Sequence, residues 1–123
     1  MSVSGILIAE SLLKSSPLEG VTLQVRKVSR GDVGDQSAGQ PLTWTFIEFN
    51  VEDHDVSDLE KALSRSLDPA GGWYCAFHTA EETFVIYAGR AFRYPRGDAQ
   101  GRAEAEAYGR SAGVPETQLD WPE

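Results

Sequence analysis

The stretch that decides the fold is Trp73-Tyr-Cys-Ala-Phe-His-Thr-Ala-Glu-Glu-Thr-Phe-Val-Ile-Tyr-Ala-Gly-Arg-Ala-Phe-Arg-Tyr94. Three segments rich in aromatic and β-branched residues are separated by two short turns, which is the pattern of consecutive hairpins. Residues 79–82 suit a four-residue hairpin loop, and Gly89 can take the positive φ of a tight second turn. We therefore predict an antiparallel meander of three strands, over 73–78, 83–87 and 90–94.

The lengths of these turns predict which side chains share a face of the meander. A loop over residues 79–82 should place His78 opposite Thr83, and the turn at 88–89 should place Thr83 opposite Tyr94. Side chains then alternate between the two faces along each strand. One face then presents Tyr74, His78, Tyr87, Phe92 and Tyr94 together. Aromatic rings with polar tips are typical of ligand pockets and interface hot spots, and equally of an ordinary core beneath a helix. Both interpretations stay open at this point.

The N-terminal half of the chain predicts three more strands. Residues 6–13 are a short apolar run, for which a helical turn is the alternative, and residues 21–28 alternate between apolar and polar side chains. Residues 42–51 give the strongest strand pattern. Between the last two, residues 29–41 are rich in Gly, Asp, Ser and Gln, and we predict a flexible loop that is either functional or merely disordered.

Two helices are expected, one before the meander and one after it. The first carries an apolar stripe of Leu59, Ala62, Leu63 and Leu67, and Ser57-Asp-Leu-Glu60 before it fits a capping box.

The second helix should run over about 99–112, with Asp98 as its N-cap and Gly113 at its end. Its small residues Ala99, Ala103 and Ala107 are expected to face the sheet. Leu119 and Trp121 in the C-terminal tail, residues 115–123, should fold back because burying them is favourable.

These elements predict an α+β fold and a single domain over residues 1–123. The order is β-β-β-α-β-β-β-α, and the simplest packing is a single mostly antiparallel sheet of five or six strands with two helices packed on one face of it. A length of 123 residues is typical of one domain with its own core.

Composition and charge limit which partners and which cellular location can be expected. A net charge of −8 counts against a nucleic acid or an anionic membrane as partner, because both would be repelled. No apolar run approaches the roughly 18 residues of a membrane span, and the start of the chain lacks the basic region of a secretory signal. The lone Cys75 cannot form an internal disulfide. A reducing cytoplasm is the expected location.

No metal site or cofactor is predicted. The acidic stretch Glu48 to Asp55 has oxygen ligands that could suit a divalent cation, but it lacks the spacing and the glycine of a calcium loop. Acidic side chains that precede a helix are explained more simply by the helix dipole. Cys75 and His78 lie three residues apart on one strand, so they should point to opposite faces and cannot act as a nucleophile and base.

Residues 90–102 form a basic strip, since they hold four of the eleven basic residues. Arg96 and Arg102, with Arg93 and the start of the second helix, suggest an anion-binding site. The alternative is a solvated or internally paired strip, and Asp98 at the helix start favours this alternative. Residues 48–60 hold six acidic side chains and no Lys or Arg. These complementary patches favour a homodimer or a charged partner, and the alternative is that they face each other within one monomer.

The leading functional prediction is a non-catalytic binding module that holds a small molecule or a protein partner on an aromatic and arginine-lined sheet face. The predicted ligand-binding residues are Tyr74, His78, Tyr87, Arg90, Arg93 and Tyr94. The alternative is a small acid–base enzyme, of hydrolase or isomerase type, that uses His78 with Glu81 or Glu82. A third possibility is a scaffold protein that binds through residues 30–40.

Overall fold

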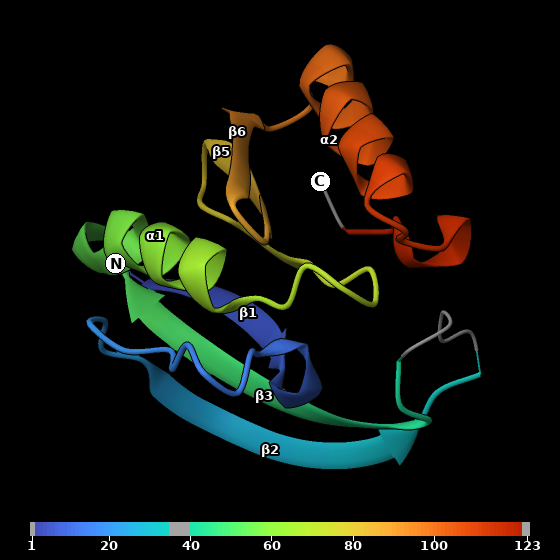
Figure 1. Ribbon diagram of the computed structural model, residues 1–123. Helices are drawn as coiled ribbons and strands as arrows, with labels where there is room; N and C mark the ends of the chain where they lie inside the picture. The colour runs from blue at the N-terminus through green and yellow to red at the C-terminus, as the bar shows by residue number, and fades with distance from the viewer. Residues whose placement is uncertain (1, 35–39, 122–123) are drawn as a thin grey trace.

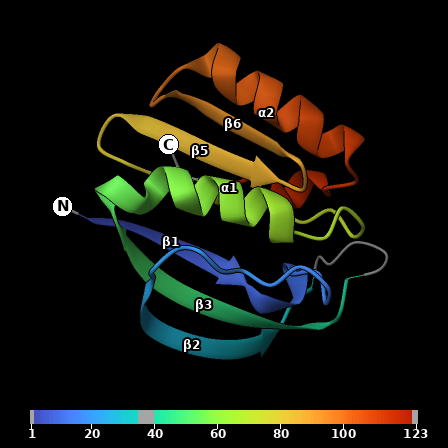
Figure 2. The same cartoon turned by 60° about the vertical axis from the view of Figure 1, so that its left-hand side comes forward.

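The structure is a computed structural model that describes residues 2–34 and 40–121. In this part of the chain one antiparallel sheet holds six strands in the order β2-β3-β1-β4-β5-β6 (Figure 2). The strands are β1 Ser2–Ile8, β2 Gln24–Asp32, β3 Thr43–Glu52, β4 Cys75–His78, β5 Glu82–Tyr87 and β6 Arg90–Pro95. The helices are α1 Val56–Ser66 and α2 Ala99–Ser111. The predicted α+β class is confirmed.

The meander pairs as the turn lengths predict. His78 lies opposite Thr83, and Thr83 lies opposite Tyr94. The N-terminal strand β1 enters the middle of the sheet, where it pairs with β3 on one side and β4 on the other. Gly5 lies at this junction, and a Cβ there would come within 2.7 Å of the Phe49 ring. A side chain at position 5 would therefore hold β1 away from its place in the sheet.

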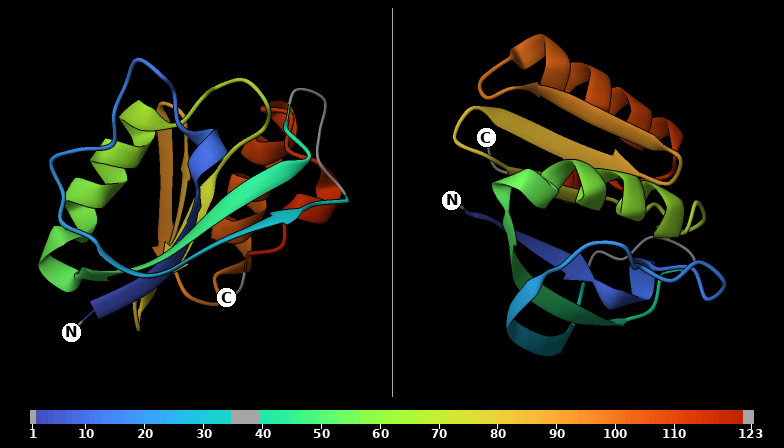
Figure 3. Two further views of the ribbon diagram at one scale, coloured as in Figure 1. Left: turned by 90° about the horizontal axis from the view of Figure 1, so that it is seen from below. Right: turned by 90° about the vertical axis from the view of Figure 1, so that its left-hand side faces the viewer.

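The two helices cover opposite faces of the sheet, and the prediction of a shared face is wrong (Figure 3). Phe84 and Ile86 of β5 pack in the core that contains α1, whereas Val85 and Tyr87 pack in the core beneath α2. Strand β5 is thus buried on both sides, which is why its sequence is a continuous apolar run rather than an alternating one. Figure 1 shows α2 at the β5–β6 end of the sheet, away from the β2–β3 pair.

The apolar stripe of α1 is buried as predicted, and no residue of the stripe is more than 1% exposed. The predicted capping box is wrong, because a 3-10 turn, η2 Asp53–Asp55, leads directly into the helix and places Ser57 inside its first turn. For α2 the predicted N-cap is confirmed, since the Asp98 carboxylate accepts a hydrogen bond from the N–H of Gln100 at 3.2 Å.

The face of α2 that meets the sheet differs from the predicted one. Ala103 and Ala107 are exposed, whereas Ala105 and Gly109 are buried against the sheet. The reason is the close approach of Tyr87: a Cβ at position 109 would lie 2.7 Å from the Tyr87 hydroxyl oxygen. Only glycine allows this contact without a shift, so Gly109 lets this face of the helix lie close to Tyr87.

Strand β2 extends further than predicted, and the predicted loop 29–41 is wrong at its start. Residues 29–32 continue the ladder with β3 as far as Asp32 opposite Thr43, because cross-strand pairing outweighs the weak strand propensity of Gly and Asp. Residues 35–39 of that loop lie outside the described residues. Val25 and Val28 are 54% and 59% exposed rather than half-buried, because β2 is an edge strand.

One smaller difference lies near the N-terminal end of the chain. The first strand begins at Ser2, and a 3-10 turn, η1 Ala9–Ser11, replaces the second half of the predicted strand over 6–13. After the short turn η3 Glu116–Gln118, the C-terminal segment returns to the sheet, and Leu119 and Trp121 are buried as expected. No helix in the described ranges is long and apolar enough to cross a membrane.

Candidate functional site

Most of the predicted aromatic face is core beneath α2. Tyr87 and Tyr94 are 1% and 5% exposed. The Tyr87 hydroxyl donates to the backbone oxygen of Ala105 at 2.8 Å, and Tyr94 accepts from the indole of Trp121. Burial, the largest cause, raises the pKa of Tyr87. These two rings hold the helix and the C-terminal segment on the sheet, so they expose almost no surface to a ligand.

The predicted arginines lie apart from one another. Arg90 stacks on the ring of Phe92, with its guanidinium carbon 4.6 Å from the ring centroid. Arg93 points to the α1 side of the sheet, where it lies over Phe84 and makes two hydrogen bonds to Glu82, of 2.8 and 2.7 Å. The bond to Glu82 is the main cause that raises the pKa of Arg93. Each guanidinium already has a partner within the chain.

The predicted anion site is not assembled. Arg102 pairs with Glu106 at 3.0 Å and donates to the backbone oxygen of Trp121 at 2.9 Å. Arg96 instead lines a separate hollow with His78 and Glu81. Because Arg93 lies on the other face of the sheet, the three arginines do not converge on one point.

His78 lies at the end of β4, beside a hollow of about 640 Å³ that Glu81 also lines. Its Nδ1 is 3.1 Å from the backbone oxygen of Thr79. Glu82 belongs to the opposite face, where Arg93 holds it. In the described part of the chain no hydrogen bond joins His78 to Glu81, so an acid–base pair is not formed there. Among residues 2–34 and 40–121 no three side chains of the metal-binding types are grouped to hold an ion.

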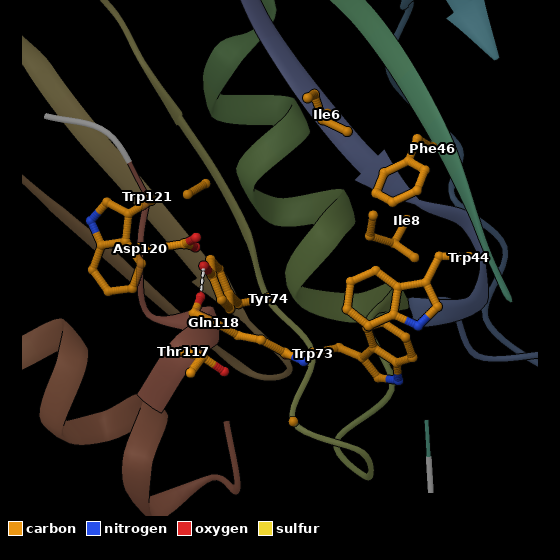
Figure 4. Close-up of a pocket in the computed structure, with 12 residues that line it drawn as sticks. Ile6, Ile8, Trp44, Phe46, Trp73, Tyr74, Thr117, Gln118, Asp120 and Trp121 are labelled. Carbon is orange, nitrogen blue, oxygen red and sulfur yellow. Dashed lines mark hydrogen bonds between the residues drawn. The ribbon is translucent and has the colours of Figure 1, made fainter. Parts of the chain in front are cut away.

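One hollow lies where the sequence analysis did not place a site. A groove of about 360 Å³ runs between the open face of β1 and β3 and the C-terminal segment (Figure 4). We call it the aromatic groove, and its lining residues are Ile6, Ile8, Trp44, Phe46, Gly72, Trp73, Tyr74, Ala76, Thr117, Gln118, Asp120 and Trp121. Tyr74 is the one predicted site residue among them.

Strand alternation and the limited reach of α2 together produce this groove. Ile8 pairs with Phe46 across β1 and β3, so their side chains share the face that is turned toward the α2 side. The core beneath α2 is built on β5 and β6. The β1–β3 part of the same face therefore has no helix over it, and Ile6 is 49% exposed.

One wall of the groove is a cluster of rings. The centroids of Trp44 and Trp73 are 5.2 Å apart at an interplanar angle of 57°, and those of Trp44 and Phe46 are 6.2 Å apart. The Trp44 indole donates to the backbone oxygen of Pro41 at 2.9 Å, which holds the ring in place. These contacts hold the rings of the wall in one arrangement, and a preformed site binds with little loss of side-chain freedom.

The opposite wall is the C-terminal segment, which Tyr74 joins to the sheet. The ring of Tyr74 meets the ring of Trp121 edge-on, with the two centroids 5.3 Å apart. The Tyr74 hydroxyl donates to the backbone oxygen of Gln118. Burial, followed by the nearby Asp120 carboxylate, raises the pKa of Tyr74, so the phenol stays neutral at physiological pH. The Gln118 amide also donates to Gln40 at 3.1 Å, which links this wall to the chain before β3.

A second hollow, lined in part by Arg26, Glu48 and His78, continues the groove. Ile6 and Ala76 line both, and the second hollow, of about 300 Å³, also contains Thr83. The Thr83 hydroxyl is buried and has no hydrogen-bond partner in the structure. Together the two hollows follow β1 and β4 along the face that α2 leaves open.

Sequence reasoning missed the groove because its residues come from segments far apart in the chain. The alternation Thr43-Trp-Thr-Phe46 does place Trp44 and Phe46 on one face of a strand. Only the strand order brings that face beside Tyr74, and only the return of the C-terminal segment adds Trp121. Comparison with known proteins gives no match to a family model, to a curated protein or to a solved structure.

Proposed function

We propose that this chain is a non-catalytic binding module whose aromatic groove holds a small molecule with an apolar body. The observation that carries the proposal is the exposure of Ile6, which is 49% accessible on a sheet face flanked by aromatic rings. A large aliphatic side chain in the middle of a sheet is normally covered by a helix or a second sheet. Here a ligand would supply the missing cover.

The size and chemistry of the groove support a small ligand. Its volume of about 360 Å³ falls in the range of ligand pockets, roughly 300–1,000 Å³. Its lining is mainly aliphatic and aromatic, with a few polar groups on Thr117, Gln118 and Asp120 that could orient the ligand. The acid–base alternative has less support, because Glu82 and His78 lie on opposite faces and none of the carboxylates in residues 2–34 and 40–121 is bonded to His78.

A neutral solvatochromic dye, Nile red, tests the proposal directly. Binding should raise and blue-shift its emission, and Ile6→Lys should abolish the effect by placing a hydrated ammonium in the groove. Val28→Lys is the matched control, because Val28 is a similarly exposed aliphatic residue of the same sheet and does not line the groove. Equal dye binding by the two variants would overturn the proposal.

A further inference from the structure

The charges around the aromatic groove indicate what kind of ligand it selects. Among the twelve lining residues Asp120 is the only one with a charged side chain, and none is Lys, Arg or His. Figure 4 shows the Asp120 carboxylate beside Tyr74, directed toward the space between the two walls. In residues 2–34 and 40–121 no salt bridge involves this carboxylate, although most arginines around α2 are paired with acids.

The rings themselves favour positive charge. The faces of aromatic rings carry negative potential, and tryptophan attracts cations most strongly. The tilt of 57° between Trp44 and Trp73, with Phe46 beside them, forms a corner rather than a flat stack, and half-buried Trp44 and Phe46 supply most of its accessible surface because Trp73 is 7% exposed. Such corners suit quaternary ammonium groups, which are large, weakly hydrated cations.

The net charge of the protein also favours a cationic ligand. Its net charge of −8 attracts cations and repels anions at long range. An anionic ligand such as a fatty acid would meet Asp120 with no base among the twelve lining residues to neutralise it, because Arg26 and His78 line the second hollow and not this groove. We propose, as a refinement that rests on the proposed function, that the groove selects an apolar organic cation, with its charged end between Asp120 and the ring wall of Trp44, Trp73 and Phe46.

The test uses three phenylbutyl compounds that differ only at one end: a trimethylammonium, a hydroxyl and a carboxylate. Their affinities for the intact protein are measured by calorimetry and by the shifts of the tryptophan indole N–H signals in NMR spectra. The trimethylammonium compound should bind roughly tenfold more tightly than the alcohol, the scale of a cation–π contact with an added ion pair. The carboxylate should bind most weakly.

Asp120→Asn should lower the affinity for the trimethylammonium compound severalfold and leave that for the alcohol unchanged. Glu104→Gln is the control, because it removes one exposed negative charge from α2 outside the groove. If the alcohol binds as tightly as the cation, or if Asp120→Asn and Glu104→Gln act alike, the cation preference is overturned while the groove remains a binding site. If neither Nile red nor any of the three compounds binds, both proposals fail.

Discussion

The indole Nε1 of Trp121 donates a hydrogen bond to the hydroxyl oxygen of Tyr94 at 2.8 Å, in a buried environment. This bond ties the C-terminal segment to β6, and the same segment forms one wall of the aromatic groove. The core beneath α2 and the candidate binding site therefore share one element. Changes in that core should affect ligand binding even where they do not touch the groove.

Tyr94→Phe should destabilise the protein by about 1–3 kcal/mol, because it leaves the buried Trp121 N–H without its acceptor. Nile red affinity should fall as well, since the wall loses an attachment point. Chemical denaturation and dye titration of the same variant measure the two effects. Tyr108→Phe is the control, because Tyr108 is only partly buried and no hydrogen bond of its hydroxyl is found in the described chain. Equal stability of the two variants would contradict this account.

Gly109→Ala should destabilise the protein although alanine is the better helix former. The new Cβ would lie 2.7 Å from the Tyr87 hydroxyl and 2.8 Å from Leu119 Cδ2, and such overpacking costs about 1–3 kcal/mol. Thermal unfolding followed by circular dichroism measures the loss. Gly31→Ala meets no atom within 4 Å and should leave the midpoint nearly unchanged. A stabilised Gly109→Ala variant would show that α2 sits further from the sheet.

Thr83→Val should stabilise the protein by about 1 kcal/mol. The buried Thr83 hydroxyl has no hydrogen-bond partner among the residues that the structure describes, so a methyl group of similar shape removes the cost of burying an unsatisfied polar atom. Thr45→Val should have the opposite effect, because its hydroxyl donates to Glu10 at 2.8 Å and accepts from Arg30 at 3.2 Å. Urea denaturation of both variants measures the change in unfolding free energy, which should be positive for Thr83→Val and negative for Thr45→Val. A destabilised Thr83→Val variant would mean that the hydroxyl is bonded in solution.

The unfolding free energy should fall as the pH rises above about 9, because complete burial raises the pKa of Cys75 from 9.0 to about 12. The unfolded chain then loses the thiol proton at a lower pH than the folded chain does. The Cys75 contribution is fully present below pH 9 and is lost progressively between pH 9 and 12, at up to about 1.4 kcal/mol per pH unit.

Denaturation curves at pH 7, 9 and 10.5 measure this slope, and Cys75→Ala should flatten it. The raised pKa values of Tyr74 and Tyr87 act in the same direction, so some alkaline loss should remain in that variant. An unchanged slope in Cys75→Ala would show that the thiol does not contribute.

Local patterns were sufficient for the meander and for both helices. The turn of residues 79–82 and Gly89 set the register of β4, β5 and β6, and the stripe of Leu59 and Leu63 identified the buried face of α1. Each of these inferences depends on residues within about ten positions of one another, where backbone preferences and side-chain alternation act directly. The Asp98 cap is of the same kind.

Contacts between segments far apart in the sequence decided the strand order and which faces of the sheet are covered. β1 enters between β3 and β4, which places Ile6 and Ile8 beside Tyr74, more than sixty positions away in the chain. Whether a helix covers a sheet face depends on where the helix crosses it, so the pattern that predicts Tyr87 on a face cannot say whether that face is core or site.

The sequence by itself thus determined the two helices, the strands of the meander with their pairing, and the acidic charge of the chain, because these depend on local sterics and composition. Only the tertiary structure decided that α1 and α2 lie on opposite faces, that Tyr87 and Tyr94 are core, and that Ile6, Trp44 and Trp73 line a groove with Asp120. The physical reason is that burial is a property of the whole packing: a side chain is covered or open according to what distant parts of the chain place on top of it.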